Sequence, residues 1–513
     1  MSAHAFGSGS RTLAIGIVSA AMAGIVAGAA ATFAPALVWL SATAVAGGVC
    51  ALVLLRFQYA VPTMFLGSLG WVLAGYAFFG RSFAYLGAPP VFIGELMLAF
   101  GLAAMFASGA LRFTLASVVT WSIVAFGLCG LAGTLPYLSA YGVDALRDAT
   151  LWAYGAFAIA VAGCVLRTHA LPVVADRYGR WLSPFAAWLP IALAITRFLG
   201  PAVPDMPGTD VSVLSMKPGD AGVHLAGAAV FVLLGLRQSE AAGGGSAPRS
   251  SKVFWTLWFV SLLFVAALTR GGFLAVAVAL VLTGLLEPLA VGRRLTAALI
   301  VLLIAAAVLL PISLTLEDGT RTAESSEDRA VTPRQVVENL LSITGRQSEA
   351  RGNLSSTREW RLDWWTSIVN YTLFGPYFWS GRGFGVNLAD EDGFQVAHEG
   401  DAPLRSPHNV YMTVLARMGV PGTALWLLFQ ICFVLSLVYG FLRARLAGAV
   451  WWARIQLWLL AYWCAFLVNA SFDVFIEGPQ GGIWFWCITG LGIAAATGSS
   501  RHLRSMHAWR VAG

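Results

Sequence analysis

The chain alternates long apolar runs with short polar connections over most of its 513 residues. Many runs hold about twenty apolar residues, enough for one helix to cross a hydrocarbon layer of about 30 Å. We therefore predict an all-α fold, a polytopic bundle of membrane helices. About fourteen spans are expected, at residues 12–31, 36–55, 61–80, 90–109, 113–133, 149–166, 182–200, 222–236, 253–270, 272–290, 296–315, 409–442, 452–470 and 480–498.

The apolar run 409–442 is longer than a single span requires. It contains the sequence Gly419-Val420-Pro421-Gly422, and both glycine and proline disfavour the interior of a helix. We predict that this run begins as a helix outside the membrane and breaks at these four residues.

One polar segment, 316–405, interrupts the apolar pattern. It carries fourteen of the 25 acidic residues of the chain and nine arginines. A large charged loop between two spans indicates that the protein handles a polar ligand at the membrane surface. The patterns divide the chain into an N-terminal bundle (1–236), a Gly/Ser-rich cytoplasmic linker (237–252), helices with an outer arginine turn (253–315), a periplasmic loop domain (316–408), C-terminal helices (409–498) and a cytoplasmic tail (499–513).

Composition supports the membrane class. Charged residues make up only 11% of the chain, against about 25% in soluble proteins. The six cysteines lie in apolar runs without metal-type spacing, which predicts packing and not disulfides or zinc. The net charge of +7 comes from arginines between spans, so we expect no nucleic-acid partner.

The positions of these arginines predict the orientation of the chain. With fourteen spans, one set of connections and the tail carry most of them, and positive connections face the cytoplasm. This set includes Arg56, Arg112, Arg167, Arg177, Arg443 and Arg501. We expect cytoplasmic termini and a periplasmic polar loop.

A second, smaller set of cations falls at the outer ends of the spans and in an outer loop; it comprises Arg81, Arg147, Arg197, Arg270 and Lys217. A guanidinium near hydrocarbon needs a partner or a function. Arg147 has the adjacent Asp148 for an ion pair. For Arg197 and Arg270, a ligand role and an interaction with lipid phosphates both remain open.

Arg270 precedes Gly271 and Gly272 in a tight outer turn. Glycine allows a ligand to approach the backbone closely, and arginine can bind a phosphate through two parallel hydrogen bonds.

Within the loop, Ser356 to Glu359 match a capping box, which predicts that a helix starts there. Trp360, Trp364 and Ile368 form an apolar stripe along it, typical of a helix lying on the bundle or in the interface.

Arg358 and Arg361 lie three residues apart and share a face of this helix. The pair suits a diphosphate; the alternative is a solvated face that pairs with nearby acids. The aromatic residues of this region can stack on sugars, or they can anchor the loop at the interface.

Two further segments of the loop carry weaker signals. Arg382 lies in the glycine-rich turn 379–385. The acids Asp390, Glu391 and Asp392 either hold a divalent cation or line a solvated loop. We expect no metal and no cofactor.

His408 follows Pro407 and precedes an apolar helix that begins at Asn409. The positive end of the helix dipole disfavours imidazolium there, so a neutral ring is expected to accept a proton from a sugar hydroxyl. The alternative is a histidine that caps the helix. His224 and His398 have weaker settings.

This order of features resembles the O-antigen ligase and O-antigen polymerase superfamily of bacterial envelope enzymes. The resembling pieces are TRGGF around Arg270, STREWRLDWW around Arg358, GRGFG around Arg382 and PHNVYMTVLARMGVPG from Pro407. The resemblance is specific over 253–422, and the strongest motif is the His-Asn pair followed by a helix that ends in a glycine-rich break.

The resemblance implies a GT-C-type glycosyltransferase of the bacterial inner membrane. It implies transfer of a glycan from undecaprenyl diphosphate to lipid A core in a ligase, or to another lipid-linked repeat unit in a polymerase. We assign proton transfer to His408. The donor diphosphate is assigned to Arg270, Arg358, Arg361, Arg197 and Arg382, with Asn409, Lys217 and Arg147 in supporting roles.

The expected reaction inverts the anomeric centre and uses fixed arginines in place of a metal. An alternative is a transporter or flippase of lipid-linked glycans, which would need charged or broken helices near the middle of the membrane. A third hypothesis is a structural scaffold, for which a neutral His408 has no use.

Overall fold

The computed structural model describes residues 60–88, 91–209, 211–236, 250–288, 292, 352–395 and 403–512. Within these ranges, the one sheet is an antiparallel pair of β1 (Gly87–Ala88) and β2 (Val91–Phe92), in which Gly87 lies opposite Phe92. The predicted spans at 12–31, 36–55 and 296–315 lie outside the described residues, as does most of the first half of the polar loop.

The other predicted spans correspond to helices. They are α3 (Val61–Phe79), α4 (Ile93–Ala107), α5 (Val118–Thr134), α8 (Gly155–Thr168), α9 (Leu171–Phe198), α10 (Pro218–Leu233), α11 (Ser250–Leu268), α12 (Arg270–Leu286), α17 (Val410–Leu446), α18 (Val450–Ala470) and α19 (Pro479–Ala512). Shorter elements are η1 (Arg81–Tyr85), η2 (Ala110–Phe113), η3 (Leu135–Tyr137), α6 (Leu138–Tyr141), α7 (Val143–Ala153), η4 (Gly200–Ala202), α15 (Gly352–Leu373), α16 (Leu388–Asp392) and η6 (Phe475–Glu477).

Six helical segments of the described chain are long and apolar enough to cross a membrane. They are α3, α5 with its continuation to Tyr141, α9, α17, α18 and α19. The bent pair α7 and α8 makes a seventh if it is one span, and α4, α10, α11 and α12 are shorter apolar helices. The all-α class of a multi-pass membrane protein is confirmed, and the total of about fourteen spans stays a prediction.

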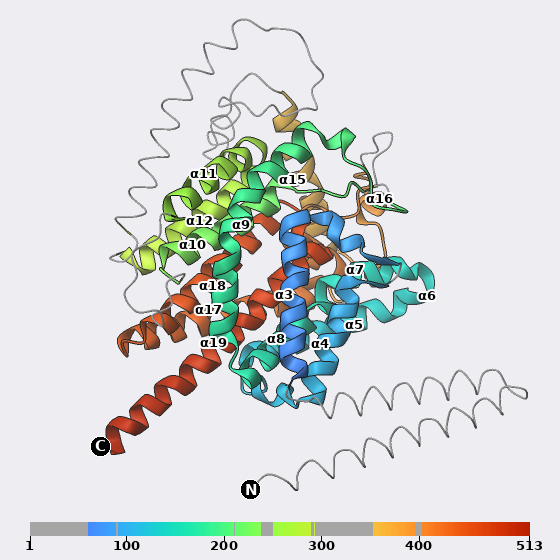
Figure 1. Ribbon diagram of the computed structural model, residues 1–513. Coiled ribbons are helices and arrows are strands. Elements are labelled where there is room, and N and C mark those ends of the chain that lie inside the picture. The colour runs from blue at the N-terminus through green and yellow to red at the C-terminus, as the bar shows by residue number, and fades with distance from the viewer. Residues whose placement is uncertain are drawn as a thin grey trace, which may run out of the picture.

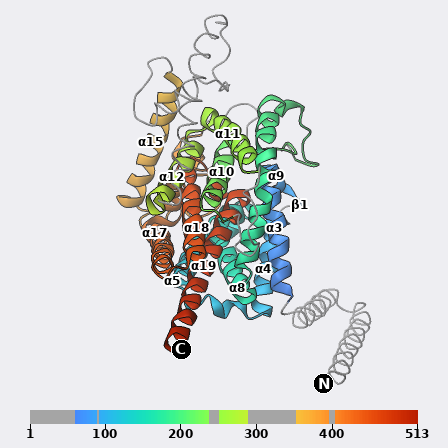
Figure 2. The ribbon, with the colours of Figure 1, turned by 60° about the vertical axis from the view of Figure 1, so that its left-hand side comes forward.

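The core lies around α18 and α19. Their apolar windows are 78% and 83% buried, against 33–44% in the other four long helices, so these two helices form the centre of the bundle (Figures 1 and 2). Large side chains fill this centre, among them Trp426, Trp458, Trp463 and Trp486. At one end of the bundle lie α15 and α16, and the last part of α19 projects beyond the other (Figure 1).

The predicted break in α17 is confirmed. Gly419 adopts φ 64° and ψ −165° inside the helix, a conformation that strongly favours glycine. The amide of Val420 donates to the carbonyl of Phe378 at 2.8 Å. A Cβ atom on Gly419 would lie only 2.5 Å from that carbonyl oxygen. The break therefore provides the surface on which the polar loop packs.

The helix of the polar loop, α15, begins earlier than predicted. It starts at Gly352, so Ser356 lies in its second turn and the predicted start at the capping box is wrong. A serine caps a helix only where the backbone amides that follow it lack helical partners, and inside a helix those amides already have them. The apolar stripe is confirmed: Trp364 and Ile368 are fully buried against α16 and α17 in a small separate core.

Members of the two predicted sets of cations lie at opposite ends of α4. At its C-terminal end, the guanidinium of Arg167 donates to the carbonyl of Ser108 at 3.4 Å, and Arg112 and Arg501 both lie over the ring of Phe113. At its N-terminal end, the amide of Ile93 donates to Leu86, which directly follows η1 and Arg81.

Candidate functional site

His408 lies one residue before the cap of α17. Asn409 is the cap, and its side-chain oxygen accepts hydrogen bonds from the amides of Tyr411 at 2.9 Å and Met412 at 3.4 Å. Asn409 is buried, so its contacts explain it as a helix-capping residue. His408 has φ 53°, which turns the chain sharply before the helix. Its side chain is 27% exposed.

The ring of His408 faces a carboxylate. Its Nδ1 atom lies 3.8 Å from Oδ1 of Asp473, in the connection between α18 and α19. The ammonium of Lys217 lies 3.6 Å from the same oxygen, and the amide of Val474 donates to it at 2.7 Å. Burial alone raises the pKa of Asp473, but His408, Lys217 and the Val474 amide outweigh it and lower this pKa to about 2. Asp473 is therefore a stable anion.

The residue before Asp473 connects the site to two arginines. The carbonyl of Phe472 accepts a hydrogen bond from Nη1 of Arg361 at 3.2 Å. A Cβ atom on Gly271 would lie 3.2 Å from the Cβ atom of Phe472, so the turn that begins with Arg270 packs against this residue. Residues 471–473 thus bring together His408, Lys217, Arg361 and the Arg270 turn.

Glycines hold Lys217 and Arg270 close to each other. Lys217 is the cap position of α10 and Arg270 is the first residue of α12. A Cβ atom on Gly222 would lie 2.7 Å from the carbonyl oxygen of Gly272, so the two backbones touch at their N-terminal turns. Two helix N-termini and two cations thus meet beside the Asp473 carboxylate, and a helix N-terminus favours the binding of an anion.

Arg197 belongs to the same end of the bundle. It lies in the last turn of α9. The amide of Met216 donates to the hydroxyl of Thr196 at 3.5 Å. Arg197 follows Thr196 in the chain and Lys217 follows Met216, so this hydrogen bond brings the backbones of the two cations close together. Arg358 lies on α15 three residues before Arg361, and its side chain lies outside the described residues.

A second carboxylate, Glu477, lies on the far side of the same connection. Its Oε1 atom accepts a hydrogen bond from Thr413 of α17 at 3.0 Å, and its carbonyl accepts one from Thr150 at 3.1 Å. Burial raises the pKa of Glu477, although the Thr413 hydrogen bond and the charge of Arg417 oppose the rise. Glu477 therefore ties the connection between α18 and α19 to α17 and to α7, close to the contact of His408 with Asp473.

Arg147 takes part in an ion-pair cluster. Its guanidinium contacts Asp144 at 3.0 Å and Asp148 at 3.6 Å, which is the structural alternative stated for it. Asp148 also accepts hydrogen bonds from Arg405 at 3.2 Å and the amide of Gly385 at 3.1 Å, and it pairs with the buried Arg417 at 3.0 Å. This cluster attaches the glycine-rich turn to the bundle.

Arg382 has a similar set of structural partners. Its guanidinium pairs with Asp392 at 3.0 Å and with Glu391 at 3.6 Å, and it lies over the rings of Tyr371 and Tyr377, at 4.5 and 4.9 Å from their centres. The side chain of Asp392 is fully buried and accepts a further hydrogen bond from Trp364 at 2.7 Å. These contacts give Arg382 a structural role in the loop, and its assignment to the donor diphosphate stays a prediction. Two of the three acids considered for a metal, Glu391 and Asp392, therefore pair with this arginine.

Asp473 and Glu477 were not predicted from the sequence. Both lie in the short connection 471–478, between α18 and α19. Only eleven of the 25 acids lie outside the long polar segment, so two acids in so short a connection were a signal that could have been used. Nor were Arg405 and Arg417 predicted, whose partner Asp148 lies far away in sequence.

Residues 255–427 match the family model described as O-antigen ligase. A comparison of the chain with curated proteins finds no match. The matched segment begins in α11, includes Arg270, α15, the glycine-rich turn and His408, and ends just after the break in α17. The family implies membrane glycosyltransferase activity of the O-antigen ligase or polymerase type, with a lipid-linked glycan and an acceptor as partners. The match over residues 255–427 of this multi-pass membrane protein thus supports the resemblance to the O-antigen ligase and polymerase superfamily that the sequence motifs indicated.

Proposed function

We propose that this protein transfers a glycan from a polyprenyl diphosphate to an acceptor sugar, at the periplasmic face of a bacterial inner membrane. The observation that carries the proposal is the contact of His408 with Asp473. The same carboxylate also pairs with Lys217, and the carbonyl of the preceding residue accepts a hydrogen bond from Arg361. A base oriented by a carboxylate and surrounded by cations suits this reaction.

In this mechanism the two parts of the cluster have different roles. Asp473 orients the Nδ1 side of the ring, so Nε2 of His408 takes the proton of the acceptor hydroxyl as it attacks. The bond from the anomeric carbon to the diphosphate oxygen breaks, and Arg270, Lys217 and Arg361 stabilise the charge on the leaving diphosphate. The proposal keeps Arg197 and Arg358 as further ligands of the diphosphate. Attack from the face opposite the diphosphate inverts the anomeric centre.

The proposal includes the orientation of the chain. Both termini and the Arg112–Arg501 end lie in the cytoplasm, and the His408 end lies in the periplasm, where the lipid-linked donor and the acceptor meet. The donor is an undecaprenyl diphosphate glycan. The acceptor is the lipid A core for a ligase or a second lipid-linked repeat for a polymerase.

Complementation of a deletion strain tests the proposal. His408→Ala and Arg270→Ala should insert at wild-type levels and restore no surface glycan, whereas His502→Ala, at the opposite end of the molecule, should restore it fully. Loss of long chains with one repeat still attached identifies a polymerase, and loss of all glycan on lipid A core identifies a ligase. Full activity of either site variant contradicts the proposal, as does purified protein that moves the donor across proteoliposomes without transfer.

A further inference from the structure

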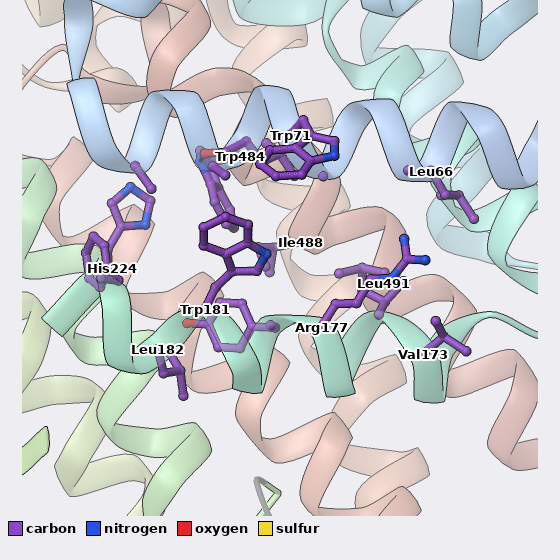
Figure 3. Close-up of a pocket in the computed structure, with 18 of the residues that line it drawn as sticks. Leu66, Trp71, Val173, Arg177, Trp181, Leu182, His224, Trp484, Ile488 and Leu491 are labelled. Atoms are coloured by element: carbon purple, nitrogen blue, oxygen red, sulfur yellow. Dashed lines mark hydrogen bonds between the residues drawn. The ribbon is translucent and has the colours of Figure 1, made fainter. Parts of the chain in front are cut away.

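A cavity of about 480 Å³ lies within the bundle, lined chiefly by α3, α9 and α19. Its volume is within the range of roughly 300–1,000 Å³ that ligand pockets occupy. Neither His408, Arg270 nor Lys217 lines it. In Figure 3, His224 lies at one end, Trp71 and Trp181 lie near the middle, and Arg177 lies towards the end near Leu66.

The walls of the cavity are apolar, and its central opening is aromatic. The indoles of Trp71 on α3 and Trp181 on α9 meet edge to face at 5.3 Å. They are 68% and 39% exposed, which in a membrane helix means contact with lipid. At the closed end, Nδ1 of His224 lies 2.6 Å from the hydroxyl of Tyr462. Such walls offer a glycan few polar partners and suit a hydrocarbon chain.

The other end of the cavity carries a positive charge. Arg177 is exposed on α9, and a Cβ atom on Gly67 would lie 4.0 Å from its Nη1 atom. Among the described residues, no carboxylate pairs with Arg177, whereas its neighbour Arg180 pairs with Asp176 at 2.6 Å. A guanidinium in this position can bind a phosphate.

Arg177 lies far from the proposed catalytic end. From Gly67 to Gly80 the chain rises about 20 Å, at about 1.5 Å per residue. Gly80 pairs with Ser215, two residues before Lys217. A phosphate on Arg177 therefore lies near the opposite membrane surface, where the proposed donor diphosphate would not reach it.

We propose that this cavity binds an anionic phospholipid, with its phosphate on Arg177 and one acyl chain between α3 and α9. The inference stands on the cavity and the position of Arg177, and it does not rest on the proposed transferase activity. The ligand is a lipid of the leaflet on the Arg177 side. In the proposed orientation, with both termini in the cytoplasm, this is the cytoplasmic leaflet.

Native mass spectrometry of the full chain, purified with its lipids and then exchanged into phosphatidylglycerol or phosphatidylcholine with identical acyl chains, tests this site. Arg177→Ala should lower the preference for phosphatidylglycerol about fivefold, the factor for about 1 kcal/mol per basic residue at a membrane surface. Gly70→Leu should reduce retention of both lipids, because Gly70 lines the cavity and nothing lies within 4 Å of a Cβ atom placed there.

Two matched variants serve as controls. Arg180→Ala removes an arginine from the same helix outside the cavity, and Gly127→Leu enlarges a glycine of α5 whose added Cβ atom would meet its nearest neighbour at 4.0 Å. Both should retain lipid as the wild type does. The proposal is overturned if the wild type shows no preference between the two lipids, if Arg177→Ala behaves like Arg180→Ala, or if undecaprenyl phosphate displaces phosphatidylglycerol completely.

Discussion

The imidazole of His408 and the carboxylate of Asp473 face each other across 3.8 Å, from the start of α17 and from the connection after α18. The distance is longer than a hydrogen bond, as catalytic contacts often are before substrate binds. Because the carboxylate also binds Lys217, any movement of one group changes the field on the other two.

Asp473→Asn should reduce glycan transfer about a hundredfold, since an amide holds the ring less firmly and cannot stabilise its protonated form; this is the low end of what a positioned base contributes. The turnover rate should fall more than the apparent affinity for donor. Asp205→Asn, in the exposed outer loop, is the control and should retain full activity. A fully active Asp473→Asn would remove Asp473 from the mechanism.

The same carboxylate predicts a dependence of stability on pH. Its pKa of about 2 in the folded chain lies below the value of about 3.9 for an unfolded aspartate, so its contribution is fully present above about pH 4 and lost as pH falls towards 2. In detergent, wild type should melt higher than Asp473→Asn near neutral pH, and the gap should close on acidification. A gap that stays constant over this range contradicts the assignment. Glu477 has a raised pKa and titrates in both proteins.

Arg382→Ala should destabilise the chain more than it affects chemistry. It leaves the buried carboxylate of Asp392 without its cation, and breaking such a pair costs roughly 3–5 kcal/mol. The melting temperature in detergent should fall, while transfer per folded molecule stays near wild type. Arg180→Ala, an exposed ion pair, is the control. A stable but inactive Arg382→Ala would return this residue to the diphosphate site.

Gly419→Ala should detach the glycine-rich turn from α17. The added methyl group would lie 2.5 Å from the carbonyl oxygen of Phe378, and the backbone there has φ 64° and ψ −165°, a region essentially restricted to glycine that costs another residue about 1–3 kcal/mol. Limited proteolysis should then cut between residues 374 and 395 faster than in wild type. Equal cleavage rates would contradict the role of Gly419. Gly127→Ala, in the regular helix α5, is the control.

Removal of divalent metal should leave transfer unchanged if fixed cations alone stabilise the leaving diphosphate. The measurement is transfer by purified protein in excess chelator, with and without added magnesium. Inhibition that magnesium reverses would contradict the metal-free mechanism. It would direct attention to Asp390 and Glu391, which are exposed at the rim of the loop.

The sequence predicted the features that depend on local pattern. Apolar length predicted the positions of the long helices, the glycine and proline at 419–422 predicted the break, and the spacing of Trp364 and Ile368 predicted the buried stripe of α15. These follow from helix period and backbone freedom, and neither needs knowledge of the tertiary fold.

Features that depend on the crossing of distant helices could not be read in the same way. The partner of His408 lies beyond both α17 and α18, and the partners of Arg382 depend on how the loop folds back on α15. An arginine near glycines looks the same in sequence whether it binds a ligand or a neighbouring carboxylate. Only the packing of the loop distinguishes the two.

The glycine contact between α10 and α12 has a consequence for how the protein can diverge. Because the backbones of α10 and α12 meet at Gly222 and Gly272, the distance between Lys217 and Arg270 does not depend on the size of side chains elsewhere in the bundle. We expect related proteins with other sugar specificities to differ in their loops and to keep this distance.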